Sequence, residues 1–455
     1  MALLSPTRSA PASSAPTRSA PTRTPAGRSA SLATRLTART GSTPGRLTVL
    51  MLALAALAIA AGLAAVIGVM QRSSEVDSII NRSGPLTLDS QELYRSLSDA
   101  DAVAASAFLS NGQEPAALRQ RYESDLAAAS AALTSATAGD PGQSAVQEIS
   151  AQLPVYAGLV ETARTYNRLN LPVGAAYLRE ASALMRNDLL VAAKRLYQAE
   201  TARFDADAGA ASGFPWLAIP LAVLTLAGLG YAQVHLTRRT NRLLNVGLAG
   251  ATAMGLAALI WLGASWVGVR GELSSAQRDG SAQVQLLARA RIDALQARAD
   301  EALTLVARGN GANFDSDYGA MLNDLIGKDG NGGLLQQAGA AATDPAVRAA
   351  ANSAAGAARS WKSTHQKVDG ADTAGDYSGA VKLTIGDDPA SSASTFNSLD
   401  KDLATGIAAT SAQLNRHARS ASDALDAAPI GLSALTVLLL VGMVFGFQQR
   451  IAEYR

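Results

Sequence analysis

The side chains that most often carry catalysis or bind metals are few in this sequence and far apart. Its 455 residues include three histidines, His235, His365 and His417, and no cysteine. His365 and His417 stand 52 residues apart on different expected helices, and His235 lies at the edge of an apolar run. No HExxH, GxSxG or lysine-containing phosphate loop is present. We therefore expect no catalytic residue, no metal, no cofactor and no enzymatic activity.

Loops rich in glycine and aspartate come nearest to a metal site. Lys328–Gly332 (KDGNG) has the composition of a calcium loop, but it lacks the alternating ligands and the closing glutamate of an EF-hand. The absence of cysteine also excludes disulfides and thiolate ligands. A role that depends on helices and their partners is therefore expected.

Four long apolar runs determine where the polar segments between them lie. Each is long enough to cross a bilayer, which needs about 20 largely apolar residues, and none contains a charged residue. The central two form a hairpin whose arms lead to long polar segments. Because the runs lack charges and polar breaks, a transporter or channel is not expected. They cover residues 47–70, 214–236, 246–269 and 428–447.

Basic and acidic residues are divided unevenly between the polar segments. The short segments 1–46, 237–245 and 448–455 hold 12 Lys and Arg against one acid, while 71–213 and 270–427 hold 27 basic and 36 acidic residues. Basic flanking segments stay on the cytoplasmic side of a membrane. We therefore expect a multi-pass plasma-membrane protein with cytoplasmic termini and two large extracytoplasmic domains. A nucleic-acid partner is not expected.

The N-terminal segment 1–46 is of low complexity, with seven arginines and no acid. It holds too little apolar surface to offset the entropy of ordering, so we expect a disordered cytosolic tail. Two roles remain open for it. It either anchors the topology and touches anionic lipid, or it is a docking or phosphorylation segment for a cytosolic partner.

The first long segment, 71–213, reads as helix throughout. Apolar residues from Leu178 to Ala199 recur at spacings of three and four, which is a seam of coiled-coil type. The segment is broken by short clusters of turn residues, and Asp140-Pro141 suits a helix start. We expect a four-helix bundle with helices at about 86–110, 114–138, 141–169 and 172–213.

The second long segment, 270–427, repeats this plan, which predicts an internal duplication. Corresponding residues lie 196 to 204 positions apart in the same order. The second copy is looser, and its last helix is expected to restart at Asp388-Pro389. The matched positions are Asn111 with Asn310, Tyr122 with Tyr318, Asp140 with Asp344, and Tyr177 with Tyr377.

Small residues at four-residue spacing on the apolar runs predict close helix packing. The abundance of glycine and alanine in this chain is an equally good explanation for any one of these ridges. The ridges are Gly247, Ala251 and Gly255; Gly442 and Gly446; Gly228 and Ala232; and Ala56, Ala60 and Ala64.

Loops at the distal ends of the two expected bundles are the candidate docking surface for an external partner. The alternative is that the apolar residues there are core and the charged ones a solvated face. The candidate residues are Asn111, Gly112, Leu171, Tyr177, Arg179, Asn310, Gly311 and Tyr377.

Cytosolic side chains are candidates for contact with an internal partner. The alternative is that they serve only as topology signals. These residues are Arg238, Arg239, Arg242, Arg450, Tyr454 and Arg455.

Two tandem four-helix domains on four spans, ending in the short tail Arg450–Arg455 (RIAEYR), resemble the GlnX-type family of actinobacterial membrane proteins. The resemblance covers residues 47–455. It implies two partners, an extracytoplasmic amino-acid-binding lipoprotein (GlnH) and a cytosolic Ser/Thr kinase, protein kinase G. Each bundle is also similar to the four-helix sensor module of chemotaxis receptors.

These observations lead us to expect an all-α membrane protein that couples signals without catalysis. It would relay amino-acid status from the solute-binding protein to the kinase through a small helix shift. A structural cell-envelope or division scaffold is the alternative, and a direct small-molecule receptor is a third reading. Whether the chain forms a homodimer is left open.

Overall fold

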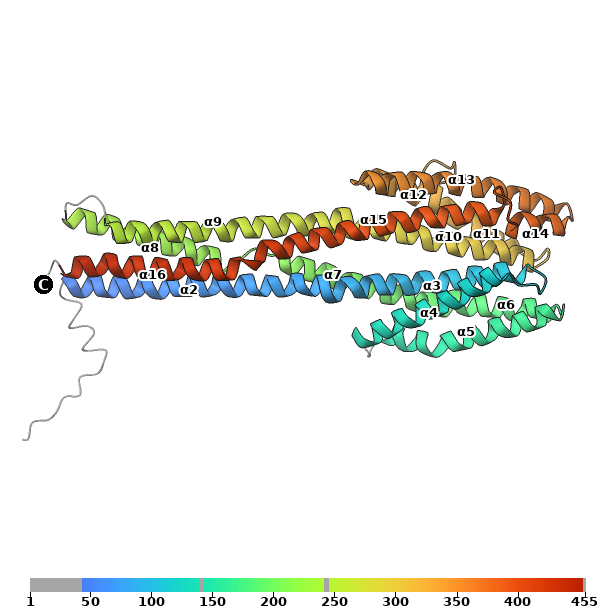
Figure 1. Cartoon of the computed structure of the whole chain (residues 1–455), viewed down its shortest axis with the longest axis horizontal. Helices are drawn as coiled ribbons and strands as arrows, with labels where there is room; N and C mark the ends of the chain where they lie inside the picture. The colour runs from blue at the N-terminus through green and yellow to red at the C-terminus, as the bar shows by residue number, and fades with distance from the viewer. Residues whose placement is uncertain (1–42, 140–142, 241–244, 453–455) are drawn as a thin grey trace, which may run out of the picture.

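The computed structural model describes residues 43–139, 143–240 and 245–452, and no strand occurs among them. The molecule is elongated, with apolar helices at one end and two helical bundles at the other (Figure 1). Four described helices are long and apolar enough to cross a membrane. The expected all-α membrane protein is therefore confirmed. The tail 1–46 lies outside the described residues up to position 42.

Three of the four apolar helices run on into the bundles. The helical stretches Gly45–Phe108 and Val246–Val306 are unbroken, and Ser392–Gln449 is interrupted only at the turn residue Ala427. The connection from α7 to α8 is not helical. Residues Gly213–Leu217 separate the two helices and include Pro215, which has no backbone N–H to donate. The membrane-spanning helices are α2 (Thr43–Ser78), α8 (Ala218–Thr240), α9 (Val246–Ser275) and α16 (Ala428–Ala452).

The first bundle follows the expected ranges within a few residues. Its breaks have left-handed backbone: Asn111 and Gly112 have φ of 48° and 80°, and Asn170 has φ of 53°, the region that glycine and asparagine tolerate best. The predicted start at Asp140-Pro141 lies outside the described residues. The helices are α3 (Gly84–Phe108), α4 (Ala116–Gly139), α5 (Ser144–Arg168), α6 (Val173–Leu184) and α7 (Leu190–Ser212), with the π-helical turn η2 (Met185–Leu189) between the last two.

The second bundle contains two additional short helices, α12 and α14. Asp344 caps α13 as predicted, because its side chain accepts a hydrogen bond from the Ala346 backbone N–H at 2.8 Å. The expected restart near Asp388 is also present, since α15 begins at Ser392. The helices are α10 (Ala282–Val306), α11 (Ala312–Ile326), α12 (Gly333–Ala341), α13 (Pro345–Thr373), α14 (Tyr377–Ile385) and α15 (Ser392–Asp426).

The turn after α10 differs from the expectation. Arg308 and Gly309, not Asn310 and Gly311, take the left-handed backbone, with φ of 44° and 86°. Gly311 serves a different purpose there. A Cβ on Gly311 would lie 2.6 Å from the carbonyl oxygen of Thr304, so glycine permits a close backbone approach.

Close packing of the membrane helices centres on the predicted glycines of α9 and α16. A Cβ on Gly247 would lie 2.5 Å from the backbone nitrogen of Gly446, so the two helices touch through their backbones. The predicted ridge Ala56–Ala60–Ala64 is wrong. Ala56 and Ala60 are exposed, and α2 packs through the neighbouring face that includes Ala58 and Ala65.

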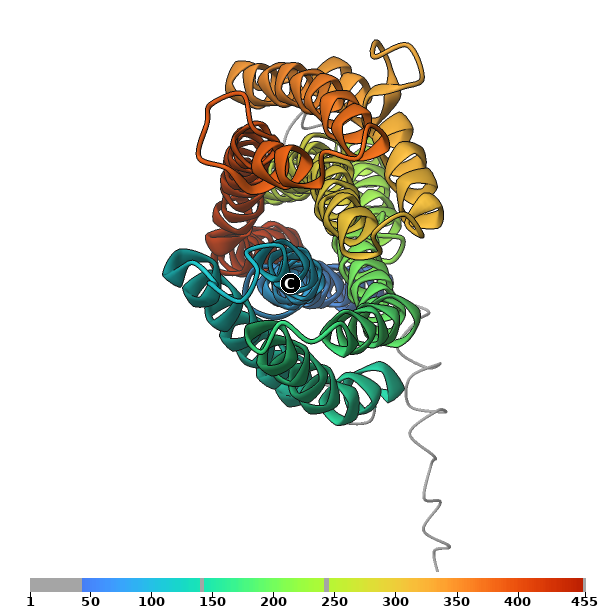
Figure 2. The same cartoon turned by 90° about the vertical axis from the view of Figure 1, so that its right-hand side faces the viewer.

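The two bundles lie side by side along their length (Figure 2). Their central helices α3 and α10 are in contact, and one apolar core contains residues of both bundles, among them Leu97 of α3 and Leu303 of α10. This shared face was not predicted from the sequence. It explains why both helices are buried on nearly every side.

Each central helix carries a π-helical turn just beyond its membrane span. The turn η1 (Ile79–Ser83) joins α2 to α3, and η3 (Ala276–Ser281) joins α9 to α10. Their first residues are 197 positions apart, close to the spacing of the sequence matches. The internal duplication stays a prediction, to which these paired turns add a structural correspondence.

Candidate functional site in the seam between the two bundles

The face where α3 and α10 meet, here called the seam, is rich in buried charge. Asp99 and Asp101 on α3 and Arg298, Asp300 and Glu301 on α10 are each at most 4% exposed. A charge removed from water is costly unless it is paired and hydrogen-bonded. The partners of these side chains therefore decide how the bundles hold together.

Arg186 joins the two bundles at one point of the seam. It lies in η2 of the first bundle, and its guanidinium donates a hydrogen bond to the carboxylate of Asp300 in the second. Its Nε lies 3.8 Å from Oδ2 of Asp101, which also accepts a hydrogen bond from Ser182 at 2.7 Å. One cation is thus shared by two buried acids from different bundles.

Burial is the largest influence on the pKa values of Asp300 and Asp101. It raises the pKa of Asp300 to about 7, although the guanidinium of Arg186 lowers it in part. Burial also raises the pKa of Asp101 above its ordinary value. The carboxylate of Asp300 therefore changes charge near neutral pH, at a contact between the bundles.

Arg121 makes a second connection across the seam. Its Nη2 lies 2.9 Å from Oδ1 of Asp99 in its own bundle and 3.3 Å from Oδ2 of Asp400 on α15. Arg291 holds the other oxygen of Asp400 at 2.6 Å. Burial alone would raise the pKa of Asp400, but the hydrogen bond and charge of Arg291, together with Arg121, bring it below its ordinary value.

A buried cluster inside the second bundle surrounds Glu301. Ser392 donates to its carboxylate at 2.6 Å, Arg298 at 2.5 Å and Trp361 at 3.1 Å. The ring nitrogen Nδ1 of His365 lies 3.1 Å from the same group. Burial acts to raise the pKa of Glu301, but the hydrogen bond from His365 and the charge of Arg298 outweigh it and bring that pKa to about 2.

His365 is placed between two carboxylates. Its Nε2 lies 3.0 Å from Oδ1 of Asp315, and the ring of Tyr318 stacks on it at 3.7 Å between centroids. Burial acts to lower the pKa of His365, whereas Glu301 and Asp315 raise it above the ordinary value. The arrangement favours a charged imidazolium that bonds to both acids.

The loops that hold most of the residues predicted to dock an external partner lie at the end of the molecule opposite the membrane helices (Figure 1). Asn111, Asn310 and Arg179 are exposed, and Gly112 packs against the backbone of Arg168. Leu171 belongs to an exposed apolar tip loop, described below.

The two predicted tyrosines are partly buried structural residues. Tyr177 stacks on Tyr166 at 5.5 Å, and Tyr377 lies beneath the guanidinium of Arg308 at 5.0 Å. Both pack against the core shared by the bundles.

The tip loop of the first bundle exposes three large apolar side chains. Leu169, Leu171 and Val173 are 61%, 44% and 45% exposed. They are alternate residues around the turn between α5 and α6. This short apolar surface is the part of the predicted docking region that best fits contact with another protein.

The predicted cytosolic residues lie at the opposite end of the molecule. Arg238 is exposed near the end of α8, Arg239 lies in the same helix, and Arg450 lies in α16. Arg242, Tyr454 and Arg455 lie outside the described residues.

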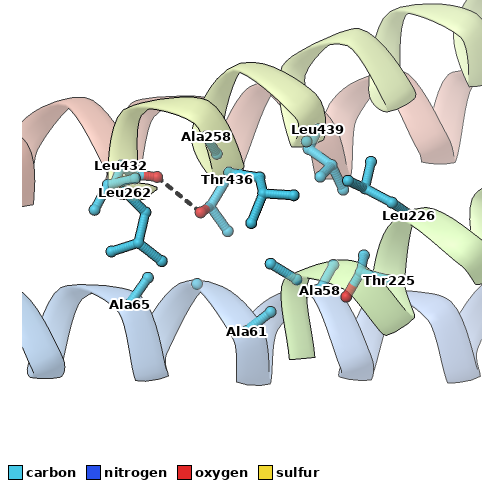
Figure 3. Close-up of a pocket in the computed structure, with 14 residues that line it drawn as sticks. Ala58, Ala61, Ala65, Thr225, Leu226, Ala258, Leu262, Leu432, Thr436 and Leu439 are labelled. Carbon is cyan, nitrogen blue, oxygen red and sulfur yellow. Dashed lines mark hydrogen bonds between the residues drawn. The ribbon is translucent and has the colours of Figure 1, made fainter. Parts of the chain in front are cut away.

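A small apolar cavity of about 40 Å³ lies among all four membrane helices (Figure 3). Its two hydroxyl groups are already satisfied, because Thr225 donates to Leu221 O and Thr436 to Leu432 O, each at 2.7 Å. Its lining contains no ionisable side chain. It does leave room for adjustment at the centre of the helix packing.

Sequence reasoning missed the seam because its residues are scattered over the chain. One local signal was available: Asp99 and Asp101 stand within a run of small residues, Ser96–Ala107. Such a run suits a helix with close neighbours on several sides.

The described residues contain no group of three or more histidine and acidic side chains able to hold a metal ion.

The fold and the seam together define a membrane protein with a bundled helical domain joined directly to its spans. Residues 75–209, which comprise nearly all of the first bundle, match the family model described as an actinobacterial sensor domain. The match covers 135 of the 455 residues and supports an actinobacterial sensor-type protein with a signalling or sensing role. No curated protein and no solved structure matches the chain.

Proposed function

We propose that this protein is a non-enzymatic transmembrane signal coupler. In this proposal a solute-binding protein that reports amino-acid status docks at the distal tips. The resulting shift of the bundles passes through the membrane to a cytosolic Ser/Thr kinase. The partners are those implied by the resemblance to the GlnX-type family, and the sensor-domain match supports the sensing half of the proposal.

Helical continuity is the observation that carries this proposal. The stretches Gly45–Phe108 and Val246–Val306 are unbroken helices that include both a membrane span and a central helix of the seam. A helix transmits displacement along its axis because its backbone hydrogen bonds hold successive turns together. A change in the seam is therefore felt at the other end of α2 and α9.

The proposed orientation places the bundles outside the cell and Arg238 inside. Because the chain has no cysteine, one introduced thiol is its only target for a maleimide. We expect a membrane-impermeant maleimide to label Ser124→Cys, at an exposed position of α4, on intact cells. Arg238→Cys should be labelled only after the membrane is opened. Labelling of Arg238→Cys alone on intact cells would mean that the orientation is the opposite of the proposed one.

Co-purification from native membranes tests the two partners separately. We expect wild-type protein to recover a solute-binding protein and a kinase. Leu171→Asp should lose the first and keep the second, whereas Ala127→Asp, at an exposed position of α4, should keep both. Recovery of neither partner by the wild type would overturn the proposal.

Deletion of the gene distinguishes the scaffold alternative. A coupler predicts altered phosphorylation of kinase substrates when the amino-acid supply changes. Defects of shape or septum with normal phosphorylation would favour a scaffold.

A further inference from the structure

A cavity of about 220 Å³ opens between the two bundles, beside the Arg121 connection. One water molecule needs roughly 10–15 Å³ of such space, so a ligand of several heavy atoms fits. Both bundles line it. Its walls come from α3 and α4 on one side and from α10, α14 and α15 on the other, and exposed Asn397 and Ala117 stand at its rim.

Three buried or half-buried charged groups line the cavity: Arg121, Arg298 and Asp99. Arg298 is 4% exposed, and its guanidinium donates hydrogen bonds to Glu301 and to the backbone oxygen of Thr384. A guanidinium has five N–H donors, so donors remain for a further acceptor.

Asp99 offers an acceptor to the same space. Its side chain is 4% exposed, and its Oδ2 accepts hydrogen bonds from Arg95 and Arg121 at 3.1 Å each. Its Oδ1 lies 2.9 Å from Nη2 of Arg121 but receives no hydrogen bond of acceptable geometry. This oxygen is paired with the charge of Arg121 but still has room for a hydrogen-bond donor, which a ligand would supply.

The lining therefore combines the remaining N–H donors of Arg298 and of Arg121, which itself donates to Asp99, Asn397 and Asp400, with an acceptor position on Asp99. The wider surroundings are close to neutral, because Asp400 faces Arg121 and Glu301 faces Arg298. A singly charged ligand would leave an uncompensated charge in this buried place. The remaining wall is apolar and aromatic, with Val103, Leu118, Ile385 and Phe396.

We propose that this cavity binds a small zwitterion, with its carboxylate between Arg121 and Arg298 and its ammonium group on Asp99. Free α-amino acids have this chemistry, and the apolar wall would hold the side chain. Because the ligand would touch both bundles, its binding changes the free energy of their packing. The inference goes beyond the proposed relay, since it concerns the purified chain without either partner.

Thermal unfolding and calorimetry of the full-length protein in detergent test the inference. The probes are the free α-amino acids, each alone, with glycine betaine, propionate and propylammonium as comparisons. We expect at least one amino acid to bind and to raise the Tm by roughly 2–5 °C at a concentration well above its Kd. Propionate and propylammonium should bind at least tenfold more weakly. Betaine has no N–H for Asp99, so equal binding of betaine would contradict the assigned ammonium contact.

A cavity-filling variant provides the matched control. Ala393→Leu places a larger side chain on the half-buried wall and leaves every charged group unchanged. We expect it to weaken amino-acid binding at least tenfold while the far-UV circular dichroism is kept. Ala127→Leu, at an exposed position of α4, should bind as the wild type does. Absence of binding by the wild type, or full binding by Ala393→Leu, would overturn the inference and leave the partner relay to be judged separately.

Discussion

The seam predicts that removal of the Arg186 charge destabilises the protein in a manner that depends on pH. Arg186→Gln leaves Asp300 and Asp101, both at most 3% exposed, without their shared cation. Breaking one partner out of a buried pair costs roughly 3–5 kcal/mol. For a domain of this size each kcal/mol lowers the Tm by roughly 2–4 °C. If both acids stayed charged, the Tm would therefore fall by roughly 6–20 °C at pH 8.

Protonation of the orphaned acids limits this loss. Because the pKa of Asp300 is already about 7 in the wild type, protonating it in the variant costs only about 1.4 kcal/mol at pH 8. At pH 6 Asp300 of the wild type is already largely protonated. The part of the loss that comes from Asp300 should therefore be limited to about 1.4 kcal/mol at pH 8 and nearly vanish at pH 6, so the Tm difference between variant and wild type should shrink at pH 6.

Thermal unfolding followed by far-UV circular dichroism at both pH values measures this difference. Arg179→Gln, at an exposed position six residues before η2, should change the Tm little at either pH. The double variant Arg186→Gln with Asp300→Asn removes the orphaned charge at the seam and should recover much of the loss. A loss that is the same at pH 6 and pH 8, or a double variant no better than the single one, would refute the charge argument and leave only lost packing.

Three further outcomes are expected. The pKa of His365 is raised in the folded state, so the contribution of His365 to stability is fully present below pH 6.5 and is lost as pH rises through the raised pKa. His365→Gln should therefore flatten the fall of Tm on the alkaline side. The contribution of Glu301 is present above pH 4.5 and declines only as pH falls towards about 2. Trp361→Ala, at a fully buried position, should cost roughly 3–5 kcal/mol in unfolding free energy, measured by thermal unfolding, and a loss below 1 kcal/mol would contradict its place in the core. Gly247→Leu should force α9 from α16 and lower the Tm, whereas Gly250→Leu, with nothing within 4 Å of its Cβ position, should not.

Much of the fold could be predicted because its signals are local. The apolar runs, the left-handed turn at Asn111-Gly112 and the Asp344 cap each depend on residues within a few positions of one another. The helix ranges of the first bundle followed from these signals. The turn at Arg308-Gly309 was misplaced by two residues because Asn310-Gly311 is the stronger turn signal in isolation.

The seam could not be predicted because its contacts join distant residues. Arg121 and Asp400 are 279 residues apart, and Arg186 and Asp300 are 114 apart. Periodicity identifies a buried face but does not say which surface covers it. The spacing of apolar residues also predicted that Ala199 is buried, and this prediction is wrong. Ala199 is exposed, and Glu200, one position further on, is buried in its place.

The two routes from the bundles to the membrane differ in a way that bears on signalling. On one route, α3 and α10 pass into α2 and α9 through the turns η1 and η3, which keep the chain helical. On the other, α7 is separated from α8 by the non-helical residues Gly213–Leu217. We therefore expect a displacement of α7 to be absorbed there and a displacement of α3 or α10 to reach the membrane helices. Because α3 and α10 are the helices that meet at the seam, the proposed signal should act on α2 and α9 more than on α8.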